Sequence, residues 1–137
     1  MSGPETYELF AIRYGSVAGR LRRDNFIIAP DHPADPHDGP MPLDYFVWAI
    51  VNENRTIVVD TGFEYSEAEK RGRKITRLPR DGLEIIGINA DTVEDVIITH
   101  LHYDHAGTLD DFPAARFHLQ ESEMNYATGK HMCHAPF

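Results

Sequence analysis

The hydrophobic and polar positions along the chain alternate between strand-like and helix-like stretches. Runs rich in aromatic and β-branched side chains predict strands, because such side chains fit the half-buried, pleated surface of a sheet. Runs of this kind cover residues 7–14, 25–29, 45–51, 56–60, 93–99 and 115–119, of which the first stops at Gly15 and the second is the weakest. The polar turn at residues 52–55 joins two of these runs and predicts a β-hairpin.

Three further segments favour helices. They cover residues 64–73, a stretch that follows Pro79 and extends to Gly87, and residues 120–128, which are closed by Gly129. Strands followed by helices predict a layered α/β domain in which helices pack on one sheet. About six strands make one sheet with an open face, and residues 129–137 predict no closing element, so we expect the fold to continue past the last residue.

Residues 30–42 form the most loop-like stretch of the single predicted domain, 1–137. They hold five of the nine prolines together with several aspartates, and this composition cannot pair regularly in a sheet. His32 and His37 lie in this stretch. An exposed acidic loop explains these two histidines better than a substrate entrance does.

Composition narrows the classes of function. A chain of 137 residues with 42% hydrophobic and 26% charged residues is typical of one soluble globular domain, and its net charge of -9 disfavours nucleic acid and membrane surfaces as partners. Cys133 is the single cysteine, which excludes an intrachain disulfide and makes the cytoplasm the expected compartment. With eight histidines, any metal site is expected to use imidazole and carboxylate ligands.

Three imidazoles and one carboxylate fall within six residues directly after the predicted strand 93–99. In an extended segment, His100 and His102 point the same way and can share one metal ion, while a turn beginning at Tyr103 can bring Asp104 and His105 to a second ion. The alternative is a set of solvated or hydrogen-bonded structural histidines. A chance match to this pattern has an expectation of roughly 0.002 at this composition, which favours metal binding.

The segment from Thr99 to His105 matches in full the Thr-His-x-His-x-Asp-His signature of the metallo-β-lactamase superfamily, and the chain is identified as resembling that family. The stretch from Ile57 to Gly62 resembles the strand and Asp-Thr-Gly turn that precede the signature. The downstream segments Phe112-Pro113 and Arg116 to Leu119 resemble the next loop and strand. Tyr126 to Gly129 is similar to the branch of N-acyl homoserine lactonases, which are quorum-quenching enzymes; the resemblance covers about residues 45–132.

This resemblance implies an αββα sandwich, of which only the N-terminal half is present, with a two-metal site at one edge. His100 and His102 would hold the first ion, and Asp104 and His105 the second, with zinc expected before iron, manganese or cobalt. A hydroxide held between the two ions would attack a carbonyl carbon. Asp104 is also the expected catalytic residue, which on protonation helps the leaving group depart.

Residues around the signature are expected to support it. Asp60 and Thr99 would orient a ligand rather than bind metal, although Asp60 can also simply cap the turn that follows it. Phe63 and Tyr65 could wall an apolar substrate pocket, a role as plausible as packing in the core. His118 is expected to be structural. The basic residues at positions 71, 73 and 74 suit a solvated helix face better than a site for an anionic substrate.

The family completes its site with a third histidine, a bridging aspartate and a final histidine far downstream of the signature. His131, Cys133 and His134 are too close to His105 to be their counterparts, and a surface or hinge segment is the better interpretation of all three. We therefore expect the chain to be the N-terminal half of a longer protein.

The favoured function is a metal-dependent hydrolase that acts on a small-molecule lactone, similar to an acyl homoserine lactone, or on a related ester; a homodimer is left open. A thioesterase of the glyoxalase II kind and a mono-iron persulfide dioxygenase resemble the same pattern. A flavodiiron oxidoreductase is disfavoured because that branch has Glu at the position of His102. The alternative from another class is a metal-free binding or assembly module.

Overall fold

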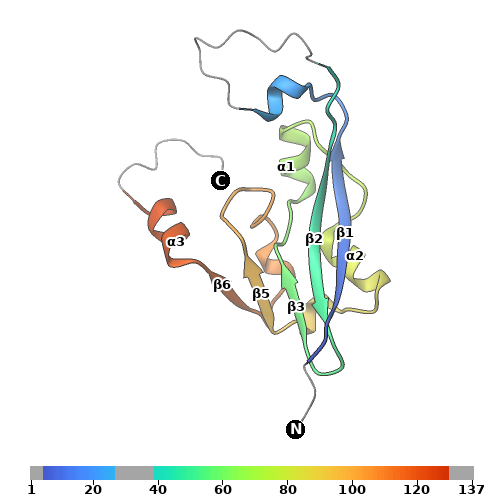
Figure 1. The fold of residues 1–137 in the computed structure, drawn as a ribbon, viewed down its shortest axis with the longest axis vertical. Coiled ribbons are helices and arrows are strands. Elements are labelled where there is room, and N and C mark those ends of the chain that lie inside the picture. The colour runs from blue at the N-terminus through green and yellow to red at the C-terminus, as the bar shows by residue number, and fades with distance from the viewer. Residues whose placement is uncertain (1–4, 27–38, 130–137) are drawn as a thin grey trace.

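The structure is a computed structural model, and it describes residues 5–26 and 39–129 (Figure 1). The strands in it are β1 (Glu8–Val17), β2 (Leu43–Val51), β3 (Thr56–Val59), β4 (Lys74–Ile75), β5 (Asp95–Ile98) and β6 (Arg116–Leu119). The helices are α1 (Tyr65–Lys70), α2 (Pro79–Ile85) and α3 (Glu121–Ala127). Short 3-10 turns cover η1 (Arg22–Asn25), η2 (Ala90–Thr92) and η3 (Leu109–Asp111).

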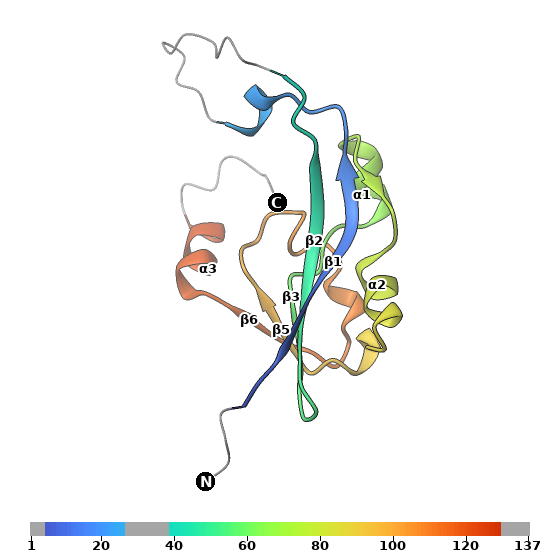
Figure 2. The same ribbon diagram turned by 45° about the vertical axis from the view of Figure 1, so that its right-hand side comes forward.

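Over the described residues the strands form one mixed sheet in the order β4-β1-β2-β3-β5-β6. The strands β1, β2, β3 and β4 pair antiparallel, whereas β3, β5 and β6 run parallel to one another. The connection from β3 to β5 carries α1 and α2, as parallel pairing requires a long crossover. Figure 2 shows both helices along the same side of β1. The predicted hairpin and the layered α/β class are confirmed.

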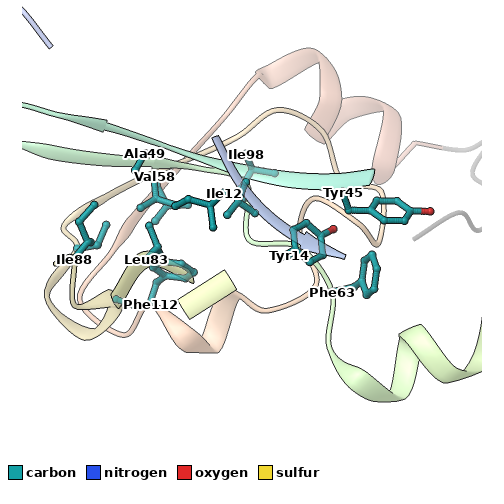
Figure 3. Close-up of a cluster of buried hydrophobic side chains, with 14 of the residues drawn as sticks. Ile12, Tyr14, Tyr45, Ala49, Val58, Phe63, Leu83, Ile88, Ile98 and Phe112 are labelled. Carbon is teal, nitrogen blue, oxygen red and sulfur yellow. The ribbon is translucent and has the colours of Figure 1, made fainter. Parts of the chain in front are cut away.

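The core lies between these helices and one face of the sheet (Figure 3). Along β2 the buried residues Tyr45, Val47 and Ala49 alternate with the exposed residues Phe46 and Trp48, which is the period of two expected of a strand with one covered face. The largest fully buried side chains are those of Tyr14, Phe63, Phe112, Leu83, Val47, Val58, Val96, Thr61 and Pro79.

The opposite face of the sheet remains apolar and open, as predicted. Trp48 pairs with Val59, and Val59 pairs with Ile97, so these three residues form one row on that face. Phe46 and Phe117 are also exposed. An apolar surface of this kind on a sheet is unusual for a molecule whose second layer is complete.

Two predicted elements have different bounds in the structure, and one strand was not predicted. The first strand continues past Gly15 to Val17, with an irregular register between Arg13 and Gly15. A side chain at Gly15 would lie 3.0 Å from the backbone oxygen of Lys74, so the glycine admits β4, a two-residue strand that the pattern did not predict. Helix 64–73 is shorter than predicted because Gly72 takes a positive φ of 64° and turns the chain into β4.

The predicted strand 25–29 is wrong at its first residue, because Asn25 ends η1, and residues 27–29 lie outside the described part of the chain. Most of the predicted loop 30–42 lies outside it as well, including His32 and His37; at its end Pro40 forms an isolated bridge with Leu21. Among the residues that the structure describes, every helix is too short and too polar to cross a membrane.

Candidate metal centre

The residues of the signature lie where two parallel strands end. The chain leaves β5 at Ile98 and enters the segment 99–107, which we call the metal loop; beside it lies the turn that follows β3. The two segments are bonded directly, because Thr61 N donates to His105 O at 2.7 Å and Gly107 N donates to Gly62 O at 2.8 Å. Ligand sites of open α/β sheets lie at this carboxyl edge.

Asp60 joins the turn to the metal loop. It is buried, with 3% of its surface exposed, and its φ of 64° is left-handed, which a non-glycine residue seldom adopts outside constrained turns. Its Oδ1 accepts hydrogen bonds from Thr99 N at 2.8 Å and from Thr99 Oγ1 at 3.0 Å, and its Oδ2 lies 2.7 Å from His105 Nδ1. The carboxylate therefore orients one imidazole and the start of the loop together.

The bond from Asp60 selects one tautomer of His105. When Nδ1–H donates a hydrogen bond to the carboxylate, the lone pair of the neutral ring is on Nε2, the atom that faces Asp104. Burial lowers the pKa of His105, but the hydrogen bond and charge of Asp60 outweigh it and hold that pKa above its ordinary value. Burial, with the neighbouring imidazoles, lowers the pKa of His100, which favours its neutral form.

The three histidine rings are close neighbours. The ring centres of His100 and His102 are 4.5 Å apart, and those of His100 and His105 are 4.0 Å apart. Thr99 Oγ1 lies 3.1 Å from His100 Nδ1. All three rings are half-buried, so they are accessible from outside the molecule. The structure thus brings the predicted ligand residues together at one edge of the sheet.

The side chains are gathered as pairs rather than as a complete metal-binding group. Within the described ranges 5–26 and 39–129, no three His, Cys, Asp or Glu side chains are arranged to hold one ion. Asp104 Oδ2 and His105 Nε2 lie 3.6 Å apart. Two ligands of one tetrahedral zinc ion, each about 2.1 Å from it, are about 3.4 Å apart. This pair fits one divalent ion, and further ligands must complete the coordination.

The two residues predicted to wall an apolar pocket do not share one. Phe63 is fully buried, and its ring packs 5.0 Å from that of Tyr14 and 5.6 Å from that of Tyr103. It borders a cavity of about 450 Å³ that lies against the metal loop at Leu101 and Tyr103. Tyr65 is exposed and borders an adjoining cavity of about 470 Å³, which shares Glu64, Ala106, Gly107 and Leu109 with the first.

The basic side chains near α1 do more than face solvent, so the expectation of a solvated helix face is wrong for two of them. The Arg71 guanidinium lies 3.8 Å above the ring of Tyr103 and pairs with Glu67, and Arg73 Nε donates to Tyr103 Oη at 3.4 Å. These contacts hold the ring of Tyr103, which lies between His102 and Asp104 in the sequence. His118 lies 2.8 Å from Asp95 Oδ1, as expected of a structural histidine.

Sequence reasoning did not single out two residues that contact the metal loop. Tyr14 Oη donates to the backbone oxygen of Asp104 at 2.8 Å, and Glu123 Oε1 accepts from Leu101 N at 2.9 Å. Burial raises the pKa of Tyr14 far above its ordinary value, so its hydroxyl stays protonated and can donate. Neither residue carries a local signal, because they lie 90 and 22 positions from their partners. His131, Cys133 and His134 lie outside the described residues.

Comparisons with known proteins agree with this arrangement. The family model described as the metallo-beta-lactamase superfamily matches residues 40–135. A search of curated proteins finds no match. Among solved structures, a quorum-quenching N-acyl homoserine lactone lactonase superposes with a TM-score of 0.68 at 22% identity, over 96% of this chain and 52% of the other.

A second structure, a quorum-quenching N-acyl homoserine lactone hydrolase, superposes with a TM-score of 0.64 at 21% identity, over 96% of this chain and 53% of that one. A probable metal-dependent hydrolase from Staphylococcus aureus superposes with a TM-score of 0.64 at 14% identity, over 99% of this chain and 55% of that one. At these identities the likeness shows the fold. The chain spans about half the length of these solved structures.

Proposed function

The chain belongs to the metallo-beta-lactamase superfamily, and from this premise we propose that the protein is a metal-dependent hydrolase of a lactone, similar to an acyl homoserine lactone, or of a related ester. The observation that carries the proposal is the meeting of three imidazoles and the Asp104 carboxylate at the carboxyl edge of β5, with Asp60 fixing His105 through Nδ1. A carboxylate bonded to the second ring nitrogen is the usual support of a metal-binding histidine.

Each residue of the site has a role in this proposal. His100 and His102 would hold one divalent ion, and Asp104 and His105 a second, with zinc the expected metal because nitrogen and carboxylate ligands suit it. Bound ions of this kind make water reactive near neutral pH and polarise a carbonyl oxygen. Asp60 would hold the Nδ1–H of His105 in a hydrogen bond, so that the neutral ring presents its Nε2 lone pair to the ion. Asp104, which is half-buried, would take up the proton that the attacking water gives up and pass it to the leaving oxygen.

The surroundings of the site support an ester or lactone with an apolar chain. The cavity of about 450 Å³ beside the metal loop is lined by Phe63, Leu101, Leu109 and other apolar side chains, with Glu64 and Glu67 at its edge. A pocket that is mainly apolar with a few polar groups suits a small organic ligand. The lactonases named above share this fold at low identity, which supports the substrate class without defining it.

The test is to compare the purified full-length protein, which we expect to extend beyond this chain, with its His102→Ala variant for metal content and for turnover of a panel of lactones and thioesters. We expect about two zinc ions per protein and lactone hydrolysis in the wild type, with both lost in the variant. His118→Gln is the matched control, because His118 contacts Asp95 rather than the metal loop, and it should keep metal and activity.

Other results of the same test would identify another function. Turnover that survives in His102→Ala would contradict the proposal. Thioester cleavage without lactone cleavage would indicate a thioesterase, and one bound iron would indicate a dioxygenase. No bound metal and no turnover would indicate a binding module.

A further inference from the structure

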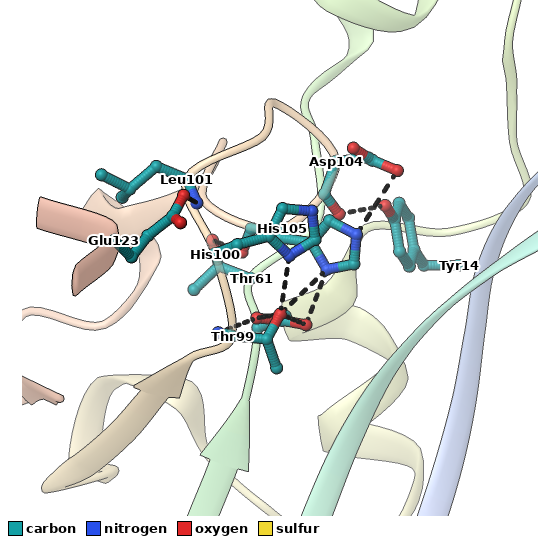
Figure 4. A network of polar contacts seen from close by, with 9 residues as sticks. Tyr14, Thr61, Thr99, His100, Leu101, Asp104, His105 and Glu123 are labelled. Atoms are coloured by element: carbon teal, nitrogen blue, oxygen red, sulfur yellow. Dashed lines mark hydrogen bonds and ion pairs between the residues drawn. The ribbon is translucent and has the colours of Figure 1, made fainter. Parts of the chain in front are cut away.

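Besides Asp60 and Thr61 in the neighbouring turn, two side chains from other elements bond to the backbone of the metal loop, one beside each pair of ligand residues. Tyr14 Oη, from β1, donates to the backbone oxygen of Asp104 at 2.8 Å. Glu123 Oε1, from α3, accepts from the backbone N–H of Leu101 at 2.9 Å. Figure 4 shows the two contacts on different sides of the histidine rings.

Each bond restrains one particular peptide plane. The carbonyl of Asp104 belongs to the peptide that joins Asp104 to His105, and the N–H of Leu101 belongs to the peptide that joins His100 to Leu101. A peptide is planar, so fixing its oxygen or its N–H fixes the direction of the whole unit and restricts the side chains that leave from either end. Tyr14 therefore acts on one ligand pair, and Glu123 acts on the start of the other.

Close packing holds the ring of Tyr14 in place, so its hydroxyl has a fixed position beneath the metal loop. The ring is fully buried, edge-on to Phe63 at 5.0 Å between ring centres and tilted against Tyr45 at 6.0 Å. Gly62 lies directly against it, and a side chain at that position would come within 2.9 Å of the Tyr14 ring. The Asp-Thr-Gly turn thus makes room for the tyrosine beneath the metal loop.

Glu123 is placed by a different part of the fold. It lies in the first turn of α3, after β6, which pairs parallel with β5, so the helix begins on the same edge of the sheet as the metal loop. Its neighbour Glu121 is exposed on the same helix, which makes it a natural comparison. The Glu123 carboxylate accepts a hydrogen bond from the backbone N–H of Leu101, which lies outside the helices and strands.

We propose that Tyr14 and Glu123 are positioning residues that act on the two metal-binding pairs separately: Tyr14 sets Asp104 and His105, and Glu123 sets His100 at the start of the other pair. This inference rests on the proposed function, because it requires that the pairs bind ions. A purely structural role for the two bonds would weaken the whole loop and affect both pairs alike. Independent control predicts that each substitution affects one pair.

The experiment follows the histidine ring signals by NMR while zinc is added to the full chain. In Tyr14→Phe we expect the signal of His105 to need roughly tenfold or more zinc for its half-change, with that of His100 unchanged. In Glu123→Ala we expect the signal of His100 to need more zinc, with that of His105 unchanged. Glu123→Gln keeps an acceptor oxygen and should behave like the wild type, which separates hydrogen bonding from charge.

Two control variants exclude general destabilisation. Ile12→Val removes one buried methyl group from the same strand as Tyr14, and Glu121→Ala removes a carboxylate from the same helix as Glu123. Both should leave every midpoint unchanged. If Tyr14→Phe does not fold, the comparison of Glu123→Ala with Glu123→Gln decides the inference alone.

The outcomes separate this inference from the function on which it rests. Equal displacement of both signals in either variant, or no displacement at all, overturns the inference while the metal site stands. Wild-type histidine signals that do not respond to zinc overturn both.

Discussion

At the scale of single residues, Asp60 has the widest influence on the candidate metal centre. One buried carboxylate accepts from Thr99 N and Thr99 Oγ1 and lies in hydrogen-bond contact with His105 Nδ1. Its left-handed backbone places it under the loop rather than in line with β3. The residue thus links the end of one strand to a ligand that follows the end of another.

Substitution of Asp60 by alanine is expected to weaken zinc binding roughly 10- to 100-fold, because His105 loses the group that fixes its tautomer and orientation. The free energy of unfolding should also fall by about 1–3 kcal/mol, since Thr99 N–H loses its buried partner. Zinc titration and urea unfolding measure the two effects. Zinc affinity equal to that of the wild type would show that the contact with His105 is incidental.

A second residue-scale prediction concerns acid stability and Asp95. Hydrogen bonds from His118 and Arg55 and the charge of Arg116 outweigh burial and lower the pKa of this carboxyl to about 2. The ordinary value in an unfolded chain is about 4, so the ionised form stabilises the fold above about pH 4, and that contribution is lost as the pH falls towards 2.

Asp95→Asn cannot ionise and should therefore lack this part of the acid dependence. We expect its urea midpoint to fall less than that of the wild type between about pH 5 and about pH 2.5. Asp44→Asn is the control, because Asp44 forms an exposed pair with Arg13 on another strand. Parallel pH curves for the Asp95 variant and the wild type would contradict the assignment.

The candidate ligands could be predicted from the sequence because they lie within six consecutive residues, where the spacing itself indicates the chemistry. Tyr14 and Glu123 could not be predicted, since each contact joins positions far apart in the chain and depends on the packing of β1 or α3. Likewise, Arg71 and Arg73 appeared to be surface charges because nothing local indicates that Tyr103 lies beside them.

At the scale of elements, periodicity predicted what is long and regular. The strands β2 and β3 are mainly continuous apolar runs on either side of a polar turn, and both were predicted. The strand β4 has two residues, which is too short for any period, and it forms because Gly15 lets a backbone oxygen approach closely. Short elements of this kind depend on neighbours that a sequence pattern does not show.

Gly82 gives a prediction for the packing of α2 on β1. A side chain here would lie 2.4 Å from Ile12 Cγ2, so Gly82→Ala should lower the free energy of unfolding by about 1–3 kcal/mol, although alanine favours helices. Gly19→Ala is the control, because a side chain there meets nothing within 4 Å. Thermal unfolding of both variants measures the difference. A more stable Gly82→Ala would show that α2 is not packed this closely.

At the scale of the whole molecule, the sheet has one covered and one open face, and the solved structures with this fold are about twice as long as the chain. Both faces of β2 carry apolar residues: Tyr45, Val47 and Ala49 on the covered face, and Phe46 and Trp48 on the open face. Such a pattern is typical of a strand buried on both faces. The small number of predicted strands already indicated this open face.

Trp48 and Val47 test the two faces against each other. Val47 is fully buried, so Val47→Ala should lower the free energy of unfolding by about 2 kcal/mol, whereas Trp48→Thr on the open face should change it by less than about 0.5 kcal/mol. Trp48→Thr should also reduce the binding of a fluorescent apolar dye. A large loss of stability in Trp48→Thr would show that its face is covered.

The most direct test of the central claim is removal and return of metal. The full-length wild-type protein is treated with a chelator, dialysed, assayed for lactone hydrolysis, and then assayed again after zinc is restored. We predict that hydrolysis is lost with the metal and recovered with about two zinc ions per protein. Hydrolysis at an unchanged rate by the metal-free protein would contradict the account.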